Sequence, residues 1–179
     1  LAAPAPDVAG DGVEVFGSTG ADPAAALAAH LDGATSGVDY VAFMAYVNPN
    51  DADEAALQGL RVAARDSRRV ATTLGFGPRF LHSTGQLHKG GPDTGVYVQI
   101  TVDDAVDAAI PGRPFTFSTL KRAQADGDLE SLRSHGRRVV RLHVSDAAAL
   151  PAALGELARG IGTAGPEREP VGAGDAGRR

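Results

Sequence analysis

The residues best suited to chemistry lie in one stretch, residues 75–95, with the sequence GFGPRFLHSTGQLHKGGPDTG. Its two histidines, His82 and His88, titrate near neutral pH and can move protons on and off oxygen. The stretch also carries side chains that suit sugar hydroxyls, a phosphate or another anion. These are Arg79, Ser83, Thr84, Gln86 and Lys89.

Several other chemistries fit this stretch poorly. His82 and His88 are six residues apart and Asp93 is the only acid among them, so a metal site is not expected. The glycines form neither a P-loop nor a dinucleotide-binding fingerprint. Ser83 lies in no G-x-S-x-G turn, which disfavours a hydrolase triad. A structural interpretation stays open: the histidines could serve as hydrogen-bonding groups, Lys89 as a solvated charge and the glycines as turns.

The segments around this stretch alternate between apolar, strand-like runs and helical patterns. Such alternation predicts an α/β fold, a three-layer αβα sandwich around a mostly parallel sheet. The stretch leaves the carboxyl end of one expected strand, where ligands bind in such sheets. A functional loop is therefore favoured over disorder. The expected strands are 13–16, 39–47, 69–76, 95–101 and 137–144, and the expected helices are 21–31, one within 48–69, 115–136 and one from about residue 150.

Local signals place the helix ends. Asp22 can cap the first helix, with Pro23 in its first turn. Asp51 and Glu54 resemble a capping box for the second helix. Residues 115–136 predict one helix, or two short ones broken near Gly127. The last helix carries an apolar stripe, and Pro151 must lie in its first turn. The stripe is formed by Leu150, Leu154, Leu157 and Ile161.

Composition narrows the class of protein. The 179 residues are 43% hydrophobic, with a net charge of −5 and no cysteine, which argues against nonspecific nucleic-acid binding and excludes disulfides. No apolar run approaches the roughly 20 residues needed to span a bilayer, and the first residues do not resemble a signal peptide, so we expect a cytoplasmic protein without membrane contact. We expect a linker or disorder over residues 1–12, one domain over 13–162 and a disordered tail over 163–179.

The stretch 75–95, together with GVYVQIT and IPGRPFTFSTLKRAQADGDLESLRSHGRRVVRLHV, resembles the C-terminal part of glucose-6-phosphate isomerase. It is most similar to the isomerase half of bacterial bifunctional transaldolase/glucose-6-phosphate isomerases, over residues 39–157. The resemblance implies a sugar-isomerase (SIS) domain. It also implies conversion of glucose 6-phosphate to fructose 6-phosphate without metal or cofactor, in an enzyme of two such domains that usually dimerises.

The resemblance also implies roles for single residues. His82, in His-Ser-Thr-Gly, best matches the ring-opening histidine of the family, and His88 is the alternative. Arg133 occupies the position of the family's cationic lysine, with Lys121 and Lys89 as rivals, although Arg133 could also be a helix C-terminal cation. No glutamate matches the family's catalytic base.

The sequence therefore predicts the C-terminal domain of such an isomerase, incomplete as an enzyme on its own. An N-terminal isomerase domain, and a transaldolase domain in some proteins, would complete it. A non-catalytic module that binds a phosphosugar and regulates a partner is the alternative, and a dimerisation domain without a ligand is a third possibility.

Overall fold

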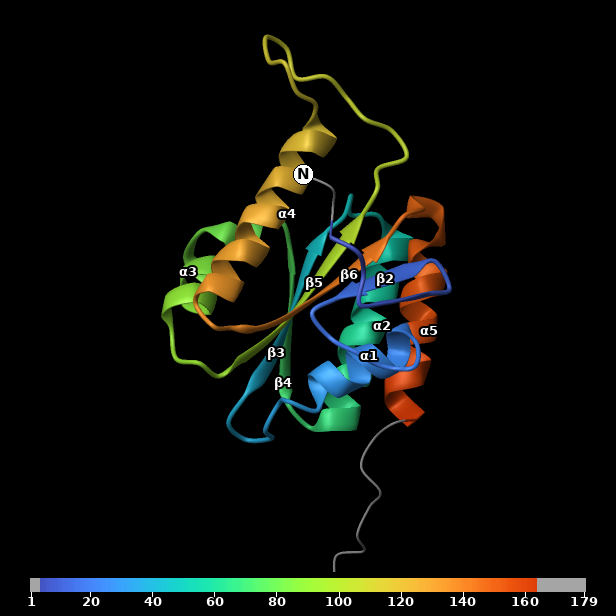
Figure 1. Ribbon diagram of the computed structural model, residues 1–179, viewed down its shortest axis with the longest axis vertical. Coiled ribbons are helices and arrows are strands. Elements are labelled where there is room, and N and C mark those ends of the chain that lie inside the picture. The colour runs from blue at the N-terminus through green and yellow to red at the C-terminus, as the bar shows by residue number, and fades with distance from the viewer. Residues whose placement is uncertain (1–3, 164–179) are drawn as a thin grey trace, which may run out of the picture.

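A computed structural model describes residues 4–163. The chain forms one six-stranded sheet in the order β1-β2-β6-β5-β3-β4 (Figure 1). Strands β6, β5, β3 and β4 are parallel, whereas β2 and β1 continue the sheet antiparallel at its β6 edge. The strands are β1 (Val8–Gly10), β2 (Val13–Phe16), β3 (Tyr40–Tyr46), β4 (Ala71–Phe76), β5 (Gly95–Val102) and β6 (Arg138–Val144).

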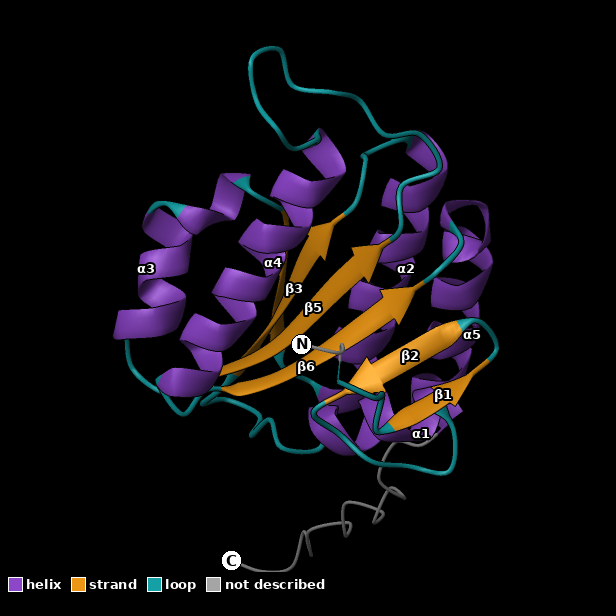
Figure 2. Ribbon diagram, turned by 45° about the horizontal axis from the view of Figure 1, so that its top comes forward, coloured by secondary structure: helices purple, strands orange, loops and turns teal. Residues whose placement is uncertain are grey.

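Helices cover both faces of this sheet, as Figure 2 shows. Helices α1, α2 and α5 pack against one face and against one another, whereas α3 and α4 lie on the other face. The expected α/β class, a three-layer sandwich with a mostly parallel sheet, is confirmed. The helices are α1 (Pro23–Leu31), α2 (Asp51–Arg68), α3 (Ser83–Gly90), α4 (Phe117–Ser134) and α5 (Leu150–Thr163).

The two faces of the sheet differ in chemistry. The face beneath α1, α2 and α5 is packed with buried aliphatic side chains from every helix and strand that reaches it. The face beneath α3 and α4 has a smaller apolar core, and toward β6 and β2 its side chains become polar. In β6, Val140, Leu142 and Val144 point to the aliphatic core, so Arg141 and His143 point to the α4 side.

Several local expectations are confirmed. Asp22 caps α1 by accepting a hydrogen bond from the amide of Ala25 at 2.8 Å. Helix α5 begins at Leu150, which places Pro151 in its first turn. The four residues of its predicted stripe are buried: Leu150, Leu154, Leu157 and Ile161.

Of the two alternatives for residues 115–136, the single helix is confirmed, because α4 continues through Gly127 without a break. Three other expectations were wrong or imprecise. The N-cap of α2 is Asn50, whose side chain accepts from the amide of Asp53, so the capping pair lies one residue before the expected one. The expected linker contains β1, which pairs with β2. The expected loop after β4 forms a short 3₁₀-helix, Arg79–Leu81, followed by α3. The expected tail lies outside the described residues, apart from Thr163.

No helix in the described range 4–163 is both long enough and apolar enough to cross a membrane.

Candidate functional site

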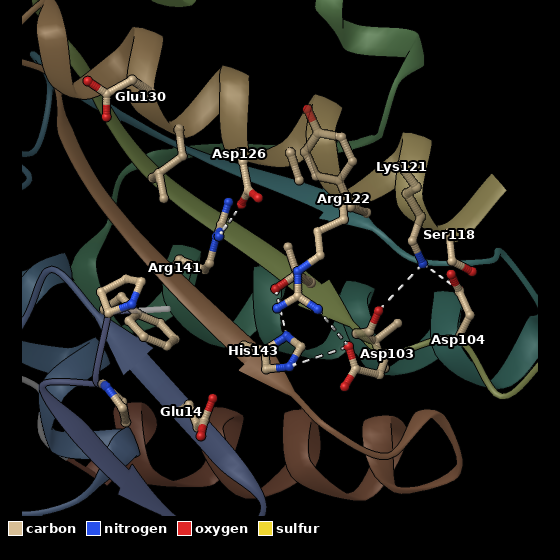
Figure 3. A pocket seen from close by; sticks show the side chains of 18 of the residues that line it. Glu14, Asp103, Asp104, Ser118, Lys121, Arg122, Asp126, Glu130, Arg141 and His143 are labelled. Atoms are coloured by element: carbon tan, nitrogen blue, oxygen red, sulfur yellow. Dashed lines mark hydrogen bonds and ion pairs between the residues drawn. The ribbon is translucent and has the colours of Figure 1, made fainter. Parts of the chain in front are cut away.

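A cavity of about 800 Å³ opens between α4 and the polar part of the sheet (Figure 3). It lies near the carboxyl ends of the neighbouring strands β3 and β5, where the connections that leave the sheet go to opposite sides. Strand β3 leads into α2 on one face, and β5 leads into α4 on the other. Ligands of open α/β sheets bind at this kind of crevice. The cavity is therefore the first candidate for a small-molecule site.

The cavity floor includes a row of side chains that runs straight across four strands. The strand register pairs Tyr46 with Thr101, Thr101 with His143, and His143 with Glu14. All four residues line the cavity. Arg141 lies two residues before His143 on the same strand, so it belongs to the same face. The floor is thus a polar strip that starts under α4 and ends at the antiparallel edge.

Ion pairs engage most of the charges that line the cavity. Arg141 Nη1 lies 2.7 Å from Asp126 Oδ1, and the Arg141 Nε donates to Gln99 at 2.6 Å. Arg122 Nη1 lies 3.4 Å from Asp103 Oδ1, and Lys121 pairs with Asp104. Three further charged side chains of the lining form no ion pair or side-chain hydrogen bond with any residue in the described range. These are Glu14, Glu130 and Arg133.

His143 occupies the middle of the floor. Its Nδ1 lies 3.0 Å from the Thr101 hydroxyl, and its Nε2 lies 3.7 Å from Asp103 Oδ1. Figure 3 shows the imidazole close to Asp103 and below Arg122. A histidine oriented by a hydroxyl on one nitrogen and faced by a carboxylate on the other can exchange a proton with a bound ligand.

Two buried donors of the cavity lining have no partner among the residues that the structure describes. They are the Tyr46 hydroxyl and Arg141 Nη2. Burial raises the pKa of Tyr46 far above its usual value, with the carboxylate of Asp128 acting in the same direction. The hydroxyl therefore keeps its proton and can donate it in a hydrogen bond. A buried polar group without a partner is costly, so each such group calls for an explanation, and a bound water, ion or ligand is one of them.

The histidine-containing stretch lies on the other side of α4. Helix α3 packs on α4, and none of its residues lines the cavity. The side chains at its first turn are exposed, and the Arg79 guanidinium lies 5.7 Å from the ring centre of Phe76. The exposed candidates of this segment are Arg79, His82, Ser83, Thr84 and Gln86.

His88 and Lys89 point inward from the same helix. The His88 side chain is buried against Tyr97, with ring centres 4.9 Å apart, and against Tyr40 at 6.2 Å. Burial lowers the pKa of His88, which favours the neutral imidazole. The Lys89 Nζ lies 2.6 Å from Asp128 Oδ1. Both residues thus belong to a buried contact between α3, α4 and the sheet.

The structure divides the predicted site residues into two groups. Seven of them, from Arg79 to Lys89, lie on the 3₁₀-helix and α3 or immediately before it, and Lys121 and Arg133 line the cavity instead. It does not bring Arg133 to His82.

Sequence reasoning missed other residues of the cavity. Two local patterns could have indicated them: the alternation of polar and apolar residues in β6, and the pair of acidic residues that follows β5. The residues concerned are Asp103, Arg141 and His143.

Comparison with protein families and with curated protein sequences gave no significant match. Among solved structures, the chain is similar to a hypothetical protein, TT0462, from Thermus thermophilus. The TM-score is 0.58 and the sequence identity 20%, over 78% of this chain and 36% of that one. The chain thus spans about a third of the length of its structural neighbour. At this identity the likeness shows the fold alone.

Proposed function

We propose that the chain is the C-terminal SIS-like domain of a glucose-6-phosphate isomerase, a cytoplasmic enzyme that interconverts glucose 6-phosphate and fructose 6-phosphate. The domain would contribute a histidine and part of the sugar-phosphate site. A second isomerase domain would supply the base that moves the proton between C1 and C2. The proposal is supported by the resemblance of residues 39–157 and by the α/β fold that the resemblance implies.

The observation that carries the proposal is the exposed first turn of α3. His82, Ser83 and Thr84 begin this helix at the carboxyl end of β4, and all three side chains are exposed. No side chain caps the helix, so its first amide groups are available to a phosphate or hydroxyl oxygen. This arrangement favours His82 over His88 as the ring-opening residue, because His88 is buried.

Two ion pairs near α3 support an incomplete active site. Asp128 on α4 is paired with Lys89, and Asp93, which follows α3, is paired with Arg137 at 3.2 Å. The proposal assigns the proton-transfer base to neither carboxylate. In this proposal Lys89 positions α3, and Arg133 and Lys121 do not contact the sugar. We expect the isolated chain to show negligible isomerase activity.

The same observation favours a second candidate, a domain that binds a sugar phosphate without catalysis and regulates a partner. A binding site needs the hydroxyls and amides of the α3 first turn but no base. The two candidates differ in what His82 does: it moves a proton in the enzyme and holds the ligand in the regulator.

A two-part experiment tests the proposal and separates the candidates. Calorimetry of the chain with fructose 6-phosphate measures binding, and a coupled assay of the chain joined to an N-terminal isomerase domain measures turnover. A His82→Ala variant that binds normally but loses turnover supports the isomerase. A variant that loses binding supports the regulator. Absence of binding to the unmodified chain, together with normal turnover in the joined His82→Ala variant, would overturn both.

A further inference from the structure

We infer that the cavity between α4 and the sheet is a second ligand site, for a small zwitterion that carries a carboxylate and an ammonium group. This site does not use the α3 surface and does not depend on the function proposed above. It is argued from unpartnered hydrogen-bond donors at one end of the polar floor and unpaired carboxylates toward the other.

Donors without partners lie at one end of the floor. The Tyr46 side chain is fully buried, yet its hydroxyl has no partner in the described chain, and Arg141 Nη2 is also unpaired. Tyr46 is on β3 and Arg141 on β6, with β5 between them. A carboxylate above β5 can accept one hydrogen bond from each residue through its two oxygens. It would satisfy both groups at once.

Acceptors without partners lie toward the other end. Glu14 ends the floor row on β2, and Glu130 faces the same cavity from α4. In Figure 3, Glu130 lies on α4 on the far side of Arg141 from Lys121, whereas Glu14 lies on β2 below Arg141. Neither forms an ion pair within residues 4–163. A cationic group bound here would neutralise carboxylates that the fold leaves free.

The overall charge of the lining selects the same ligand class. Three pairs cancel: Lys121 with Asp104, Arg122 with Asp103, and Arg141 with Asp126. The unpaired charges are one arginine, Arg133, and two glutamates. A simple anion would add charge to a lining that is already slightly negative. A zwitterion satisfies the two donors and the glutamates without adding net charge.

Sheet geometry gives the expected separation of the two charges. The carboxylate lies above β5 and the ammonium near β2, two strand spacings or about 10 Å apart. Subtracting about 3 Å for a hydrogen bond to Glu14 leaves roughly 7 Å between the ligand's charged groups. An extended 6-aminohexanoate has about this length. It fits a cavity of about 800 Å³, which is within the usual range for ligand sites.

The test uses three matched probes and the complete 179-residue chain. Calorimetry with 6-aminohexanoate, hexanoate and hexylammonium separates the contributions of the two charged groups, and glycine controls for their separation. We expect 6-aminohexanoate to bind at least about tenfold more tightly than either singly charged probe and more tightly than glycine. Equal binding of all four probes, or binding of none, would overturn the inference.

Two variants assign the binding to the floor. Tyr46→Phe removes only the unpartnered hydroxyl and keeps the ring, which packs 5.3 Å from Phe80 between centres. We expect an unchanged or higher urea midpoint and about a tenfold loss of affinity for 6-aminohexanoate and hexanoate. Glu14→Gln should weaken the binding of 6-aminohexanoate and leave the affinity for hexanoate unchanged.

The matched control for Glu14→Gln is Glu54→Gln, which changes an exposed glutamate of α2 on the opposite face of the sheet. It should leave all affinities unchanged. Full affinity in a folded Tyr46→Phe variant would place the ligand elsewhere and contradict the inference.

Discussion

Lys89 on α3 and Asp128 on α4 form an ion pair, with 2.6 Å between Nζ and Oδ1. The Asp128 side chain is 2% exposed, and the second oxygen of its carboxylate has no partner among the described residues. The pair therefore joins the two helices that cover one face of the sheet. A lysine held in this way stabilises the position of α3, and with it the exposed first turn that carries His82.

Loss of the lysine should destabilise the fold. Lys89→Met keeps most of the aliphatic volume and leaves the Asp128 carboxylate buried without a cation. We expect a loss of about 3 kcal/mol in the free energy of unfolding, because a buried charge without its partner is costly. Urea denaturation at pH 7 measures the difference.

The control for this variant is the exposed pair of Arg122 and Asp103, whose side chains are 63% and 53% exposed. Arg122→Met should cost less than about 1 kcal/mol, since solvent and salt screen such pairs. Similar costs for the two variants would show that Asp128 tolerates burial without Lys89.

Acid should destabilise the protein through buried histidines. Burial lowers the pKa of His30 from 6.5 to about 4, although the hydrogen bond to the Tyr97 carbonyl at 3.0 Å acts in the opposite direction. Burial also lowers the pKa of His88. The unfolded chain therefore binds more protons than the folded one below pH 6.5. Stability is fully present above that pH and is lost as the pH falls toward 4, by up to about 3 kcal/mol for His30.

A His30→Gln variant tests this assignment, because an amide can still donate to the Tyr97 carbonyl but does not titrate. The dependence of the unfolding free energy on pH between 4 and 6.5 should become shallower. It should become shallower still when His88 is also replaced. An unchanged dependence in the double variant would assign the acid sensitivity to other groups.

Replacement of two helical glycines by alanine should change the free energy of unfolding in opposite directions. A β-carbon at Gly127 in α4 would meet no atom within 4 Å, whereas at Gly160 in α5 it would lie 2.4 Å from the Ala24 side chain. We expect Gly127→Ala to raise the free energy of unfolding by about 0.5–1 kcal/mol, through helix propensity. Gly160→Ala should lower it by about 1–3 kcal/mol, because α1 and α5 must move apart. Thermal unfolding of both variants measures the signs, and a destabilised Gly127→Ala would indicate a need for glycine there.

The strands and most helices could be predicted because their signals are local. Continuous apolar runs mark β3 and β5, and the stripe from Leu150 to Ile161 marks α5. Helix α3 was missed because its glycines weaken the helical pattern and its support is tertiary. Gly85 lies so close to the Phe80 carbonyl that a β-carbon would be 2.8 Å from that oxygen, and Lys89 is fixed by a residue on another helix.

The cavity could be predicted only in part. The alternation from Val140 to Val144 shows that Arg141 and His143 share one face of a strand, and this signal is local. Their neighbours on that face depend on the strand order, which places Glu14 beside His143 through a pairing of segments more than a hundred residues apart. No local pattern encodes that contact.

The most direct test of the proposed function is titration of fructose 6-phosphate into the chain. Calorimetry measures the heat of binding and NMR spectroscopy records the histidine side chains, and the variants His82→Ala and His135→Ala are compared in parallel. His135 is also exposed and lies at the C-terminal end of α4, so it controls for the loss of a surface histidine. We expect the unmodified chain, His135→Ala and His82→Ala to bind the sugar phosphate, because in the proposed isomerase His82 moves a proton and does not hold the ligand. We also expect the ligand to perturb the His82 imidazole resonances in NMR spectra of the unmodified chain. The same heat for glucose 6-phosphate, fructose 6-phosphate and inorganic sulfate, with no change at His82, would contradict the proposed function.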